Sequence, residues 1–385
     1  MLHRLNYQCF LIFFVFAVGF FIISCGSKAV RPVSELDTPE HHFSVGMKFL
    51  DQEKYTDAKG EFDRAIALDP KYSKSYAGNG LVMAYQRDFK AANGSMKQAR
   101  KFAKTDDDKV FVCTSWIKLY TLSKAGKDWI KDAKSEFYKA IAIDPQSSAA
   151  YYFMGIADKT ALDFTDAGLM FKQVIEMKRD YVKEADTEWN LTQKIQKAMP
   201  GTITGKKIAI LESINRADAA ALFMEELKID ALYKKKAIKT FDTSFKGPEK
   251  AKAKAITATD IANYPSKADI EGILRVGVRG LETYPDGLFH PNDMVDRATY
   301  AMMIEDILIK VSGDNSLATK FMGSTSPFPD LRSDLPYFNA VMVVTSRGMM
   351  EAKDLSSGEF GPLDPVTGVD ALLIIRKLKE ELKIF

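Results

Sequence analysis

"FDRAIALDP", residues 62–70, recurs in the sequence as "FYKAIAIDP" at residues 137–145. In both segments a Phe and an Ala stand three positions apart, which places them on one face of a helix. Both segments end in Asp-Pro, and proline cannot continue a helix, whereas Asp caps or turns the chain. Each segment is therefore predicted to be the second helix of a helical hairpin, together with the signal that ends it.

A period of 34 residues extends this pattern along the chain. Gly46 and Gly80 are 34 positions apart, as are Ala58 and Ala92, and the spacing resumes after an insertion around "LSKAGKD" (122–128). Glycines in such positions let paired helices approach closely. Repetition at this period predicts stacked hairpins that share a continuous core.

The repeats resemble the tetratricopeptide repeat, of which four units can be placed between about residues 41 and 180. The matching positions are Gly46, Ala58, Phe62, Ala65 and Pro70; Tyr76, Gly80, Ala92 and Ala99; Ala133, Phe137, Ala140 and Pro145; and Tyr151, Gly155, Ala167 and Phe171. The third unit departs from the family's pattern, because Thr121 stands at its Gly position. A helix at about 184–199 is expected to cap the repeats, which places the repeat domain at residues 41–200.

The resemblance implies a concave groove that binds a peptide or a partner protein. A spacer without a ligand is the alternative. The tyrosines of this region are interpreted as packing residues rather than as a stripe along the groove. They are Tyr72, Tyr76, Tyr85, Tyr120, Tyr151 and Tyr152.

The first residues have the features of a secretory signal peptide, residues 1–24. His3 and Arg4 precede an apolar run from Cys9 to Ile23, and a small residue leads into Cys25. This run is shorter than the roughly 20 residues that a membrane-spanning helix needs. A cleaved signal is therefore favoured over an uncleaved anchor.

Residues Ile22 to Cys25 resemble the lipobox of bacterial lipoproteins. The resemblance implies that Cys25 carries a covalent lipid, becomes the mature N-terminus and holds the chain to a membrane. Gly26, in place of an Asp, is similar to the family's outer-membrane sorting pattern. We therefore expect an outer-membrane lipoprotein of the cell envelope, facing the periplasm or the cell surface. Residues 25–40 lack apolar periodicity and are expected to form a tether.

Beyond Pro200 the 34-residue period ends and three similar helix starts appear. They are "INRADAAALFMEEL" (214–227), "VDRATYAMMIEDIL" (295–308) and "VTGVDALLIIRKL" (366–378). In each, a β-branched residue precedes a capping residue, and a second capping-type residue follows three positions later. This spacing predicts N-caps at Asn215, Asp296 and Thr367.

Arg216 and Arg297 directly follow two of these caps. A cation in the first turn opposes the helix dipole, so its presence at the same place twice predicts an anionic counterpart. Free backbone amides, the dipole and the guanidinium together could bind an anion. The alternative is an internal Asp or Glu as the counterpart.

Residues 201–385 resemble the S-layer homology domain in three degenerate copies. The second copy matches best, at Asp260, Ile273, Leu274, Gly277, Val278, Tyr284, Asp286, Gly287, Phe289, Pro291, Arg297 and Ala298. The third copy keeps Phe328, Pro329, Asp330, Gly348, Phe360, Pro362 and Thr367, but has Gly368 in place of the Arg. The first copy keeps its "NRAD" helix start and lacks the Pro-Asp-Gly loop.

The resemblance implies that this domain binds cell-wall glycan, either peptidoglycan or an attached acidic polymer. Pro285-Asp286-Gly287 sets a tight turn, and Phe289 and Pro291 hold the loop against the helices. Arg297 would then reach an acidic sugar substituent at the edge of a groove. The candidate glycan-binding residues are Arg297, Asp286, Gly287, Arg216, Asp296 and His290.

Composition argues against an enzyme and against a nucleic-acid-binding protein. The net charge is +3, without a global polyanion-binding signature. Cys9 would leave with the signal peptide and Cys25 would carry the lipid, so Cys113 is the remaining cysteine and is expected in the core. We therefore expect no metal site, and no cofactor besides the lipid on Cys25. His41 and His42 are expected to be exposed, and the chain has no nucleophile motif or phosphate-binding loop. The lysine-rich linker 233–255 is interpreted as a solvated loop.

These patterns together predict a mainly α protein, in which a solenoid of helical hairpins precedes a three-copy helical domain with long loops. We expect a non-enzymatic envelope lipoprotein that bridges a membrane, a protein partner and cell-wall glycan. The alternative is a scaffold lipoprotein for secretion, pilus assembly or polysaccharide export, whose C-terminal domain binds no glycan.

Overall fold

Contacts between residues divide the chain into two compact units, which are described one at a time. The structure is a computed structural model that describes residues 29–239 and 258–384, with only the backbone of 235–239. Unit 1 comprises the residues up to Thr160 and Glu176–Tyr181, and unit 2 comprises Ala161–Ile175 and the chain from Val182 onward. Helices make up most of the described residues, and none of these residues belongs to a strand. The prediction of a mainly α protein is confirmed.

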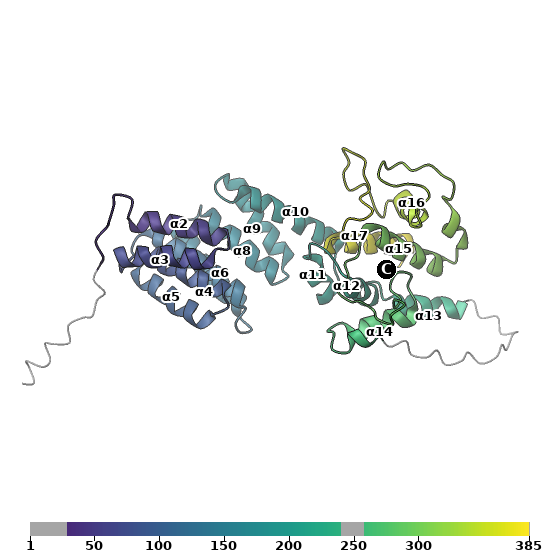
Figure 1. Ribbon diagram of the computed structural model, residues 1–385, viewed down its shortest axis with the longest axis horizontal. Helices are drawn as coiled ribbons and strands as arrows, with labels where there is room; N and C mark the ends of the chain where they lie inside the picture. The colour runs from purple at the N-terminus through teal and green to yellow at the C-terminus, as the bar shows by residue number, and fades with distance from the viewer. Residues whose placement is uncertain (1–28, 240–257, 385) are drawn as a thin grey trace, which may run out of the picture. The chain divides into compact units, whose positions relative to one another are not determined.

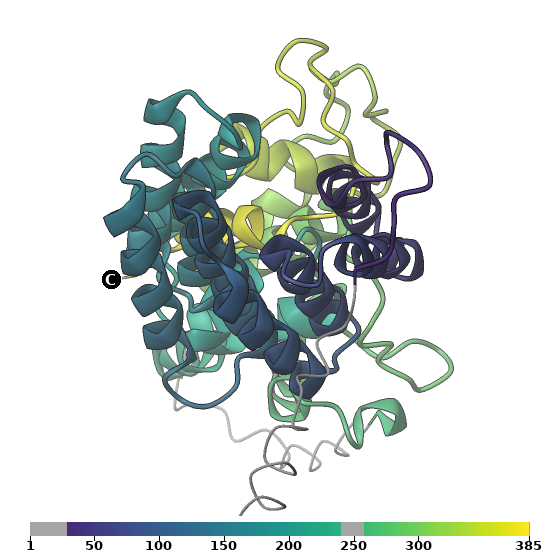
Figure 2. The same ribbon diagram turned by 90° about the vertical axis from the view of Figure 1, so that its left-hand side faces the viewer.

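Unit 1 is a series of helices joined by short connections, coloured purple to teal in the two ribbon views (Figure 1, Figure 2). The helices are α2 (Pro39–Asp51), α3 (Tyr55–Leu68), α4 (Ser73–Tyr85), α5 (Phe89–Phe102), α6 (Asp106–Ser123), α7 (Trp129–Ile143) and α8 (Ser148–Thr160). The most extensive contacts join α2 to α3, α4 to α5 and α6 to α7. Because short connections make neighbouring helices antiparallel, unit 1 is built of packed hairpins.

The residues that define the sequence period lie in the core of unit 1. Phe62 of α3 is fully buried, as are the alanines at its neighbouring helical positions. A Cβ on Gly46 would lie 2.6 Å from the Phe62 ring, and a Cβ on Gly80 would lie 3.0 Å from the Met96 side chain. Glycine therefore lets α2 approach α3 and lets α4 approach α5, as predicted. Helix α3 ends at Leu68, directly before the Asp-Pro of the quoted segment.

Unit 2 contains the remaining helices and the longer loops. They are most of α9 (Phe164–Met177), then α10 (Val182–Ala198), α11 (Ile203–Ala209), α12 (Arg216–Ala221), the π-helical turn η1 (Leu222–Glu226), α13 (Ile229–Lys239), η2 (Thr259–Ile261), α14 (Lys267–Val276), α15 (Arg297–Ser312), η3 (Asn315–Thr319), α16 (Phe338–Ser346) and α17 (Gly368–Glu381). One buried apolar cluster extends through these elements, from Phe164 to Leu378. Among the described residues, no helix has both the length and the apolar character needed to cross a membrane.

The residues just ahead of α12, α15 and α17 form a closed ring of backbone hydrogen bonds. The N–H of Ile214 donates to the carbonyl of Val366 at 2.9 Å, and the N–H of Val366 donates to Val295 at 3.0 Å. The N–H of Val295 completes the ring by donating to Ile214 at 3.0 Å. Since each segment donates to one neighbour and accepts from the other, the three helix starts are tied together around one centre.

The boundary between the units differs from the sequence prediction, which placed it at Pro200. Helix α10 corresponds to the helix expected at 184–199, and it packs against α17. Its residues Ile195 and Ala198 belong to the same buried cluster as Ile208 and Phe223. This apolar continuity groups α10 with unit 2.

Two segments that were expected to be irregular are partly ordered by contacts. Helix α2 begins at Pro39, and the N–H of Val30 donates to the carbonyl of Ala67 at 2.7 Å, so the end of the predicted tether lies against the first hairpin. The linker predicted at 233–255 begins inside α13, which continues to Lys239, because Lys and Ala are good helix formers. Residues 25–28 and 240–257 lie outside the described part of the chain.

Candidate functional site

The three predicted caps are present in unit 2. The side chain of Asn215 accepts from the N–H of Asp218, and the Asp218 carboxylate accepts in return from the N–H of Asn215. Asp296 and Thr367 cap α15 and α17 by the same contact, each accepting from the N–H three residues later. The first turns of all three helices are therefore fixed by their own sequences.

Arg216 is buried and its guanidinium is surrounded by main-chain carbonyls. Its Nε donates to the carbonyl of Phe289 at 2.8 Å, Nη1 to Gly280 at 2.6 Å and Nη2 to Glu282 at 2.7 Å. The guanidinium carbon lies 4.7 Å from the ring centroids of both Tyr284 and Phe289. Burial lowers the pKa of Arg216, and nearby acidic groups act in the opposite direction. Its side chain, 6% exposed, binds the loop 280–290 and is not presented to a ligand.

Arg297 repeats this arrangement one helix start later. Its Nε donates to the carbonyl of Phe360 at 2.8 Å and its Nη2 to that of Glu351 at 2.6 Å, while the guanidinium lies 4.6 Å from the Phe360 ring. Burial lowers its pKa as well. Unlike Arg216, Arg297 is half-buried. Its Nη1 has no hydrogen-bond acceptor within the described chain.

The amides at the helix starts are also engaged. The N–H groups of Arg216 and Ala217 donate to carbonyls of the loop before α15, at 2.9 and 3.1 Å. Those of Arg297 and Ala298 donate to carbonyls of the loop before α17, both at 2.9 Å. Main-chain carbonyls thus take the place of the anionic counterpart that the sequence suggested. The interpretation of Arg216 as a free anion-binding group is corrected, and so is the alternative of an internal Asp or Glu.

Gly368, the residue that replaces the Arg at the third helix start, has a specific packing role. Its N–H donates to the carbonyl of Leu211 at 2.9 Å. A Cβ at this position would lie 1.7 Å from the carbonyl oxygen of Ile208. The end of α11 therefore occupies the space that a side chain would need.

The loop 280–290 is ordered by hydrogen bonds within its turn and by a carboxylate from an earlier segment. Gly287 has φ of +79°, a backbone conformation that favours glycine, and its N–H donates to the carbonyl of Tyr284 at 2.9 Å. Asp260 accepts from the N–H groups of Phe289 and His290, at 3.0 and 2.7 Å. Asp330 holds the equivalent loop before α17 in the same way, so two aspartates that received no role from the sequence fix both loops.

Asp286 and His290 form a pair on the outer side of this loop. The imidazole Nε2 lies 2.7 Å from the Asp286 carboxylate, and the two side chains are 48% and 36% exposed for Asp286 and His290 respectively. The His290 ring also packs edge-on against Tyr284, with 5.1 Å between centroids. The hydrogen bond with Asp286 raises the pKa of His290, and the N–H of Leu288, followed by His290, lowers the pKa of Asp286. With the exposed Tyr284, the loop presents one aromatic and two polar groups.

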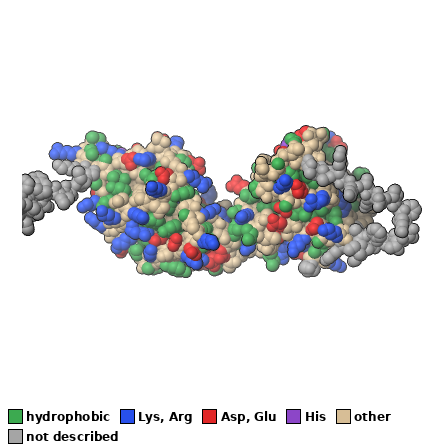
Figure 3. Space-filling model, turned by 90° about the horizontal axis from the view of Figure 1, so that it is seen from below, with side chains coloured by type: hydrophobic (Ala, Val, Ile, Leu, Met, Phe, Trp, Pro, Cys, Tyr) green, Lys and Arg blue, Asp and Glu red, His purple; other side chains and the backbone are tan. Residues whose placement is uncertain are grey.

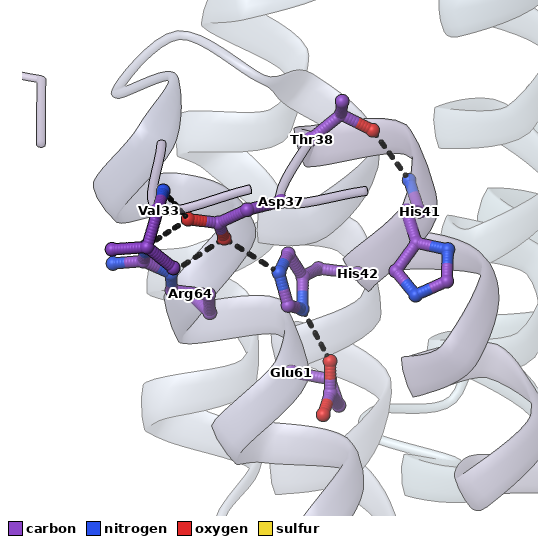
Figure 4. A network of polar contacts seen from close by, with 7 residues as sticks. All are labelled: Val33, Asp37, Thr38, His41, His42, Glu61 and Arg64. Carbon is purple, nitrogen blue, oxygen red and sulfur yellow. Dashed lines mark hydrogen bonds and ion pairs between the residues drawn. The ribbon is translucent and has the colours of Figure 1, made fainter. Parts of the chain in front are cut away.

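His42 is not the exposed side chain that the sequence predicted. Figure 4 shows its ring between two carboxylates, Asp37 at 2.9 Å and Glu61 at 2.5 Å. Arg64 of α3 also donates to the Asp37 carboxylate, through Nε at 2.9 Å and through Nη2. The Arg64 guanidinium holds the pKa of Asp37 well below its usual range, and the N–H of Val33 adds to this effect. The network fixes the chain ahead of α2 to the first hairpin.

The remaining predicted positions have simpler outcomes. Cys113 is a buried free thiol in α6, and burial raises its pKa to about 11, which fits the predicted core role. Cys25 lies outside the described residues. In the parts of the chain that the structure describes, no group of three or more His, Cys, Asp or Glu residues is placed to hold a metal ion.

On the face drawn in Figure 3, basic and acidic side chains are interspersed over unit 1.

Comparisons with known proteins add no assignment. A scan against models of protein families matches none of them, and a search of curated proteins finds no match.

Proposed function

We propose that this protein is a non-enzymatic lipoprotein of the cell envelope that joins a membrane to cell-wall glycan and to a protein partner. Lipid on Cys25 would supply the membrane attachment. The helical hairpins, which we assign to the tetratricopeptide repeat, would supply the partner-binding groove. The C-terminal unit, which we assign to the S-layer homology domain, would bind peptidoglycan or an attached acidic polymer.

The observation that supports glycan binding best is the exposed face of the loop 280–290. Tyr284, Asp286 and His290 lie together there on a backbone held by Arg216 and Asp260. An exposed aromatic ring can cover the apolar face of a sugar, while a carboxylate and an imidazole can bond its hydroxyl groups. In this proposal the buried Arg216 acts as a positioning residue, and Arg297 offers only its half-exposed outer edge.

Retention of the protein on purified peptidoglycan sacculi tests the proposal. The chain from residue 26 onward, produced without lipid, would be pulled down with sacculi before and after removal of attached acidic polymers. The double variant Asp286→Asn, His290→Asn is the appropriate change, because both side chains are exposed and Asn tolerates the positive φ of His290. We expect it to reduce retention roughly tenfold, the loss of one or two hydrogen bonds.

The control is another exposed ion pair of unit 2, Arg332 with Asp334. Asp334→Asn should leave retention unchanged. Loss of retention after removal of the acidic polymers would identify those polymers as the ligand. Equal retention of the wild type and the double variant would refute a role for this loop.

A scaffold lipoprotein for secretion, pilus assembly or polysaccharide export is the second candidate. It is favoured by the internal contacts of Arg216 and Arg297, because these arginines bind loops of their own unit. Under this alternative unit 2 is a platform, and the unaltered chain would not be retained by sacculi.

A further inference from the structure

Unit 2 contains a cavity of about 640 Å³ to which no role has been given above. It is lined by the end of α10, by the turn between η1 and α13, and by α17. Cavities that hold small ligands measure roughly 300 to 1,000 Å³. None of the lining residues belongs to the loop 280–290, so this cavity is separate from the proposed glycan-binding face.

The inner wall of the cavity is aliphatic. Its buried members are 5% exposed or less, and they are Ala198, Leu227, Leu372 and Ile375. Exposed and half-buried side chains continue the apolar surface toward the solvent, and they are Met199, Ala231, Leu232 and Ile384. Among the described lining residues, none is aromatic and none carries a hydroxyl group. Such a wall suits a flexible alkyl chain, because it offers apolar contact without directional bonds.

The acidic groups that line the cavity already have partners within unit 2. The Glu226 carboxylate accepts from the N–H groups of Gly201 and Thr202, at 3.1 and 2.8 Å, and from the Thr202 hydroxyl at 2.6 Å. The Glu380 carboxylate accepts from Nε of Arg376 at 3.0 Å. Both lining carboxylates and one lining cation are therefore engaged.

Two lysines bring the remaining charge to the cavity. Lys228 is exposed and Lys379 is half-buried. In the described chain, neither ammonium group makes a hydrogen bond or an ion pair. Other lysines of unit 2 do have carboxylate partners, such as Lys310 with Asp306 at 2.7 Å. The cavity thus combines an apolar interior with positive charge that the described residues do not neutralise.

We propose that this cavity binds a fatty acid, with the alkyl chain against the aliphatic wall and the carboxylate beside Lys228 and Lys379. A single-chain anion matches both parts of the cavity, because the wall favours methylene groups and the ammonium groups favour a negative charge. A folded protein partner fits less well, since a specific interface takes roughly 20 to 30 residues a side, more than line this cavity. The inference goes beyond the proposed function, which assigns no ligand to this part of unit 2.

Calorimetric titration with short soluble amphiphiles tests this proposal. Octanoate, decanoate and decyltrimethylammonium, each below its micelle concentration, would be titrated into the lipid-free chain from residue 26 onward. The two additional methylene groups of decanoate should tighten binding roughly tenfold relative to octanoate. Decyltrimethylammonium has a chain of the same length and the opposite charge, so it should bind roughly tenfold more weakly than decanoate. Equal affinity for the anion and the cation would overturn the proposal, as would the absence of decanoate binding.

A variant that fills the cavity locates the binding site. Ala231 lines the cavity from the first turn of α13 and is exposed, so Ala231→Trp adds a large side chain there without removing a core residue. We expect Ala231→Trp to weaken decanoate binding roughly tenfold or more. The control is Ala268→Trp, an exposed alanine in the first turn of α14 that does not line the cavity, and it should bind as the wild type does. Unchanged binding in Ala231→Trp would overturn the proposal.

A second variant removes the charge and keeps the apolar wall. In the double variant Lys228→Asn, Lys379→Gln, Asn is chosen because it tolerates the φ of +53° at position 228. Decanoate binding should weaken roughly fivefold, and the preference for decanoate over decyltrimethylammonium should disappear. The control is the double variant Lys207→Gln, Lys320→Gln, which removes two exposed lysines of the same unit outside the cavity and should keep the preference. A preference that persists without Lys228 and Lys379 would contradict their role.

A second copy of the chain is the other occupant that these variants can reveal. A wild-type dimer that dissociates in Ala231→Trp, measured by sedimentation and found together with no decanoate binding, would assign the cavity to self-association and overturn the proposal. The sacculus experiment is separate, because its variants alter the loop 280–290. Sacculus retention without decanoate binding would overturn only the fatty-acid site, and decanoate binding without retention would overturn only the glycan-binding function.

Discussion

Arg216 and Arg297 occupy the same place at two helix starts but differ in burial. Arg216 makes three carbonyl contacts from a buried position, and Arg297 makes two from a half-buried one. A planar guanidinium can serve several acceptors at once, whereas an ammonium group cannot match that geometry. The two arginines therefore stabilise their loops by the same mechanism to different extents.

Replacement of Arg216 by Lys should therefore leave carbonyls of the loop 280–290 unsatisfied. We expect Arg216→Lys to lower the free energy of unfolding by roughly 2 to 4 kcal/mol and Arg297→Lys by roughly 1 to 2 kcal/mol. Urea unfolding would measure this, followed by the fluorescence of Trp189 in a chain whose Trp116 and Trp129 are replaced by Phe. Equal losses of unfolding free energy in the two variants would contradict the inference that the more deeply buried Arg216 stabilises its loop more than Arg297 does.

Sequence patterns predicted only part of the candidate site in unit 2, and its individual residues show why. The caps at Asn215, Asp296 and Thr367 were predictable, because cap and partner are three residues apart. The acceptors of Arg216 lie 64 to 73 positions away and are carbonyls, which every residue has. No side-chain pattern marks such a contact.

At the scale of elements, the ring formed by Ile214, Val295 and Val366 should open as one cooperative structure. Each of its three amides depends on a carbonyl from another segment. We expect hydrogen exchange to give these amides opening free energies within roughly 1 kcal/mol of one another. In Arg216→Lys all three should exchange faster together.

The amide of Leu288, which donates to Asp286 in the exposed turn, is the internal reference and should exchange far sooner. Exchange of one ring amide at the rate of Leu288 would show that the ring is not cooperative.

The elements themselves were predictable where the apolar period is strong. The segment at 62–70 gives the end of α3 because its Phe and Ala face the core and Asp-Pro stops the helix. Helices α11 and α13 were not foreseen, because α11 is one short stretch and α13 enters a lysine-rich segment that resembled a solvated loop. Helix α10 shares its core with α17, and no local pattern marks a contact between segments so far apart in the sequence.

At the scale of the whole molecule, the network around Asp37 should determine part of the response to acid. Its pKa is lower in the folded chain than in the unfolded one, where an Asp has a value of about 3.9. Such a group stabilises the fold above the unfolded value, and this contribution is lost as the pH falls through the folded value. The thermal unfolding midpoint of the wild type should therefore decrease as the pH is lowered below about 4.

Asp37→Asn should lower the midpoint at neutral pH and flatten its decline in acid, because Asn does not titrate. Circular dichroism between about pH 7 and pH 3 would measure both effects. Glu35→Gln, at an exposed neighbouring position, is the control and should follow the wild type. An acid response of Asp37→Asn as steep as that of the wild type would locate the sensitivity elsewhere.

The glycine at position 368 has a consequence for how unit 2 can change. The arginines of the first two helix starts reach loops that lie before the next of the three helix starts, whereas Gly368 meets the end of α11 with no room for a Cβ. A side chain at position 368 would therefore need the end of α11 to move away. The third helix start and α11 have to change together, so a segment transplanted into this unit must bring its complementary neighbour with it.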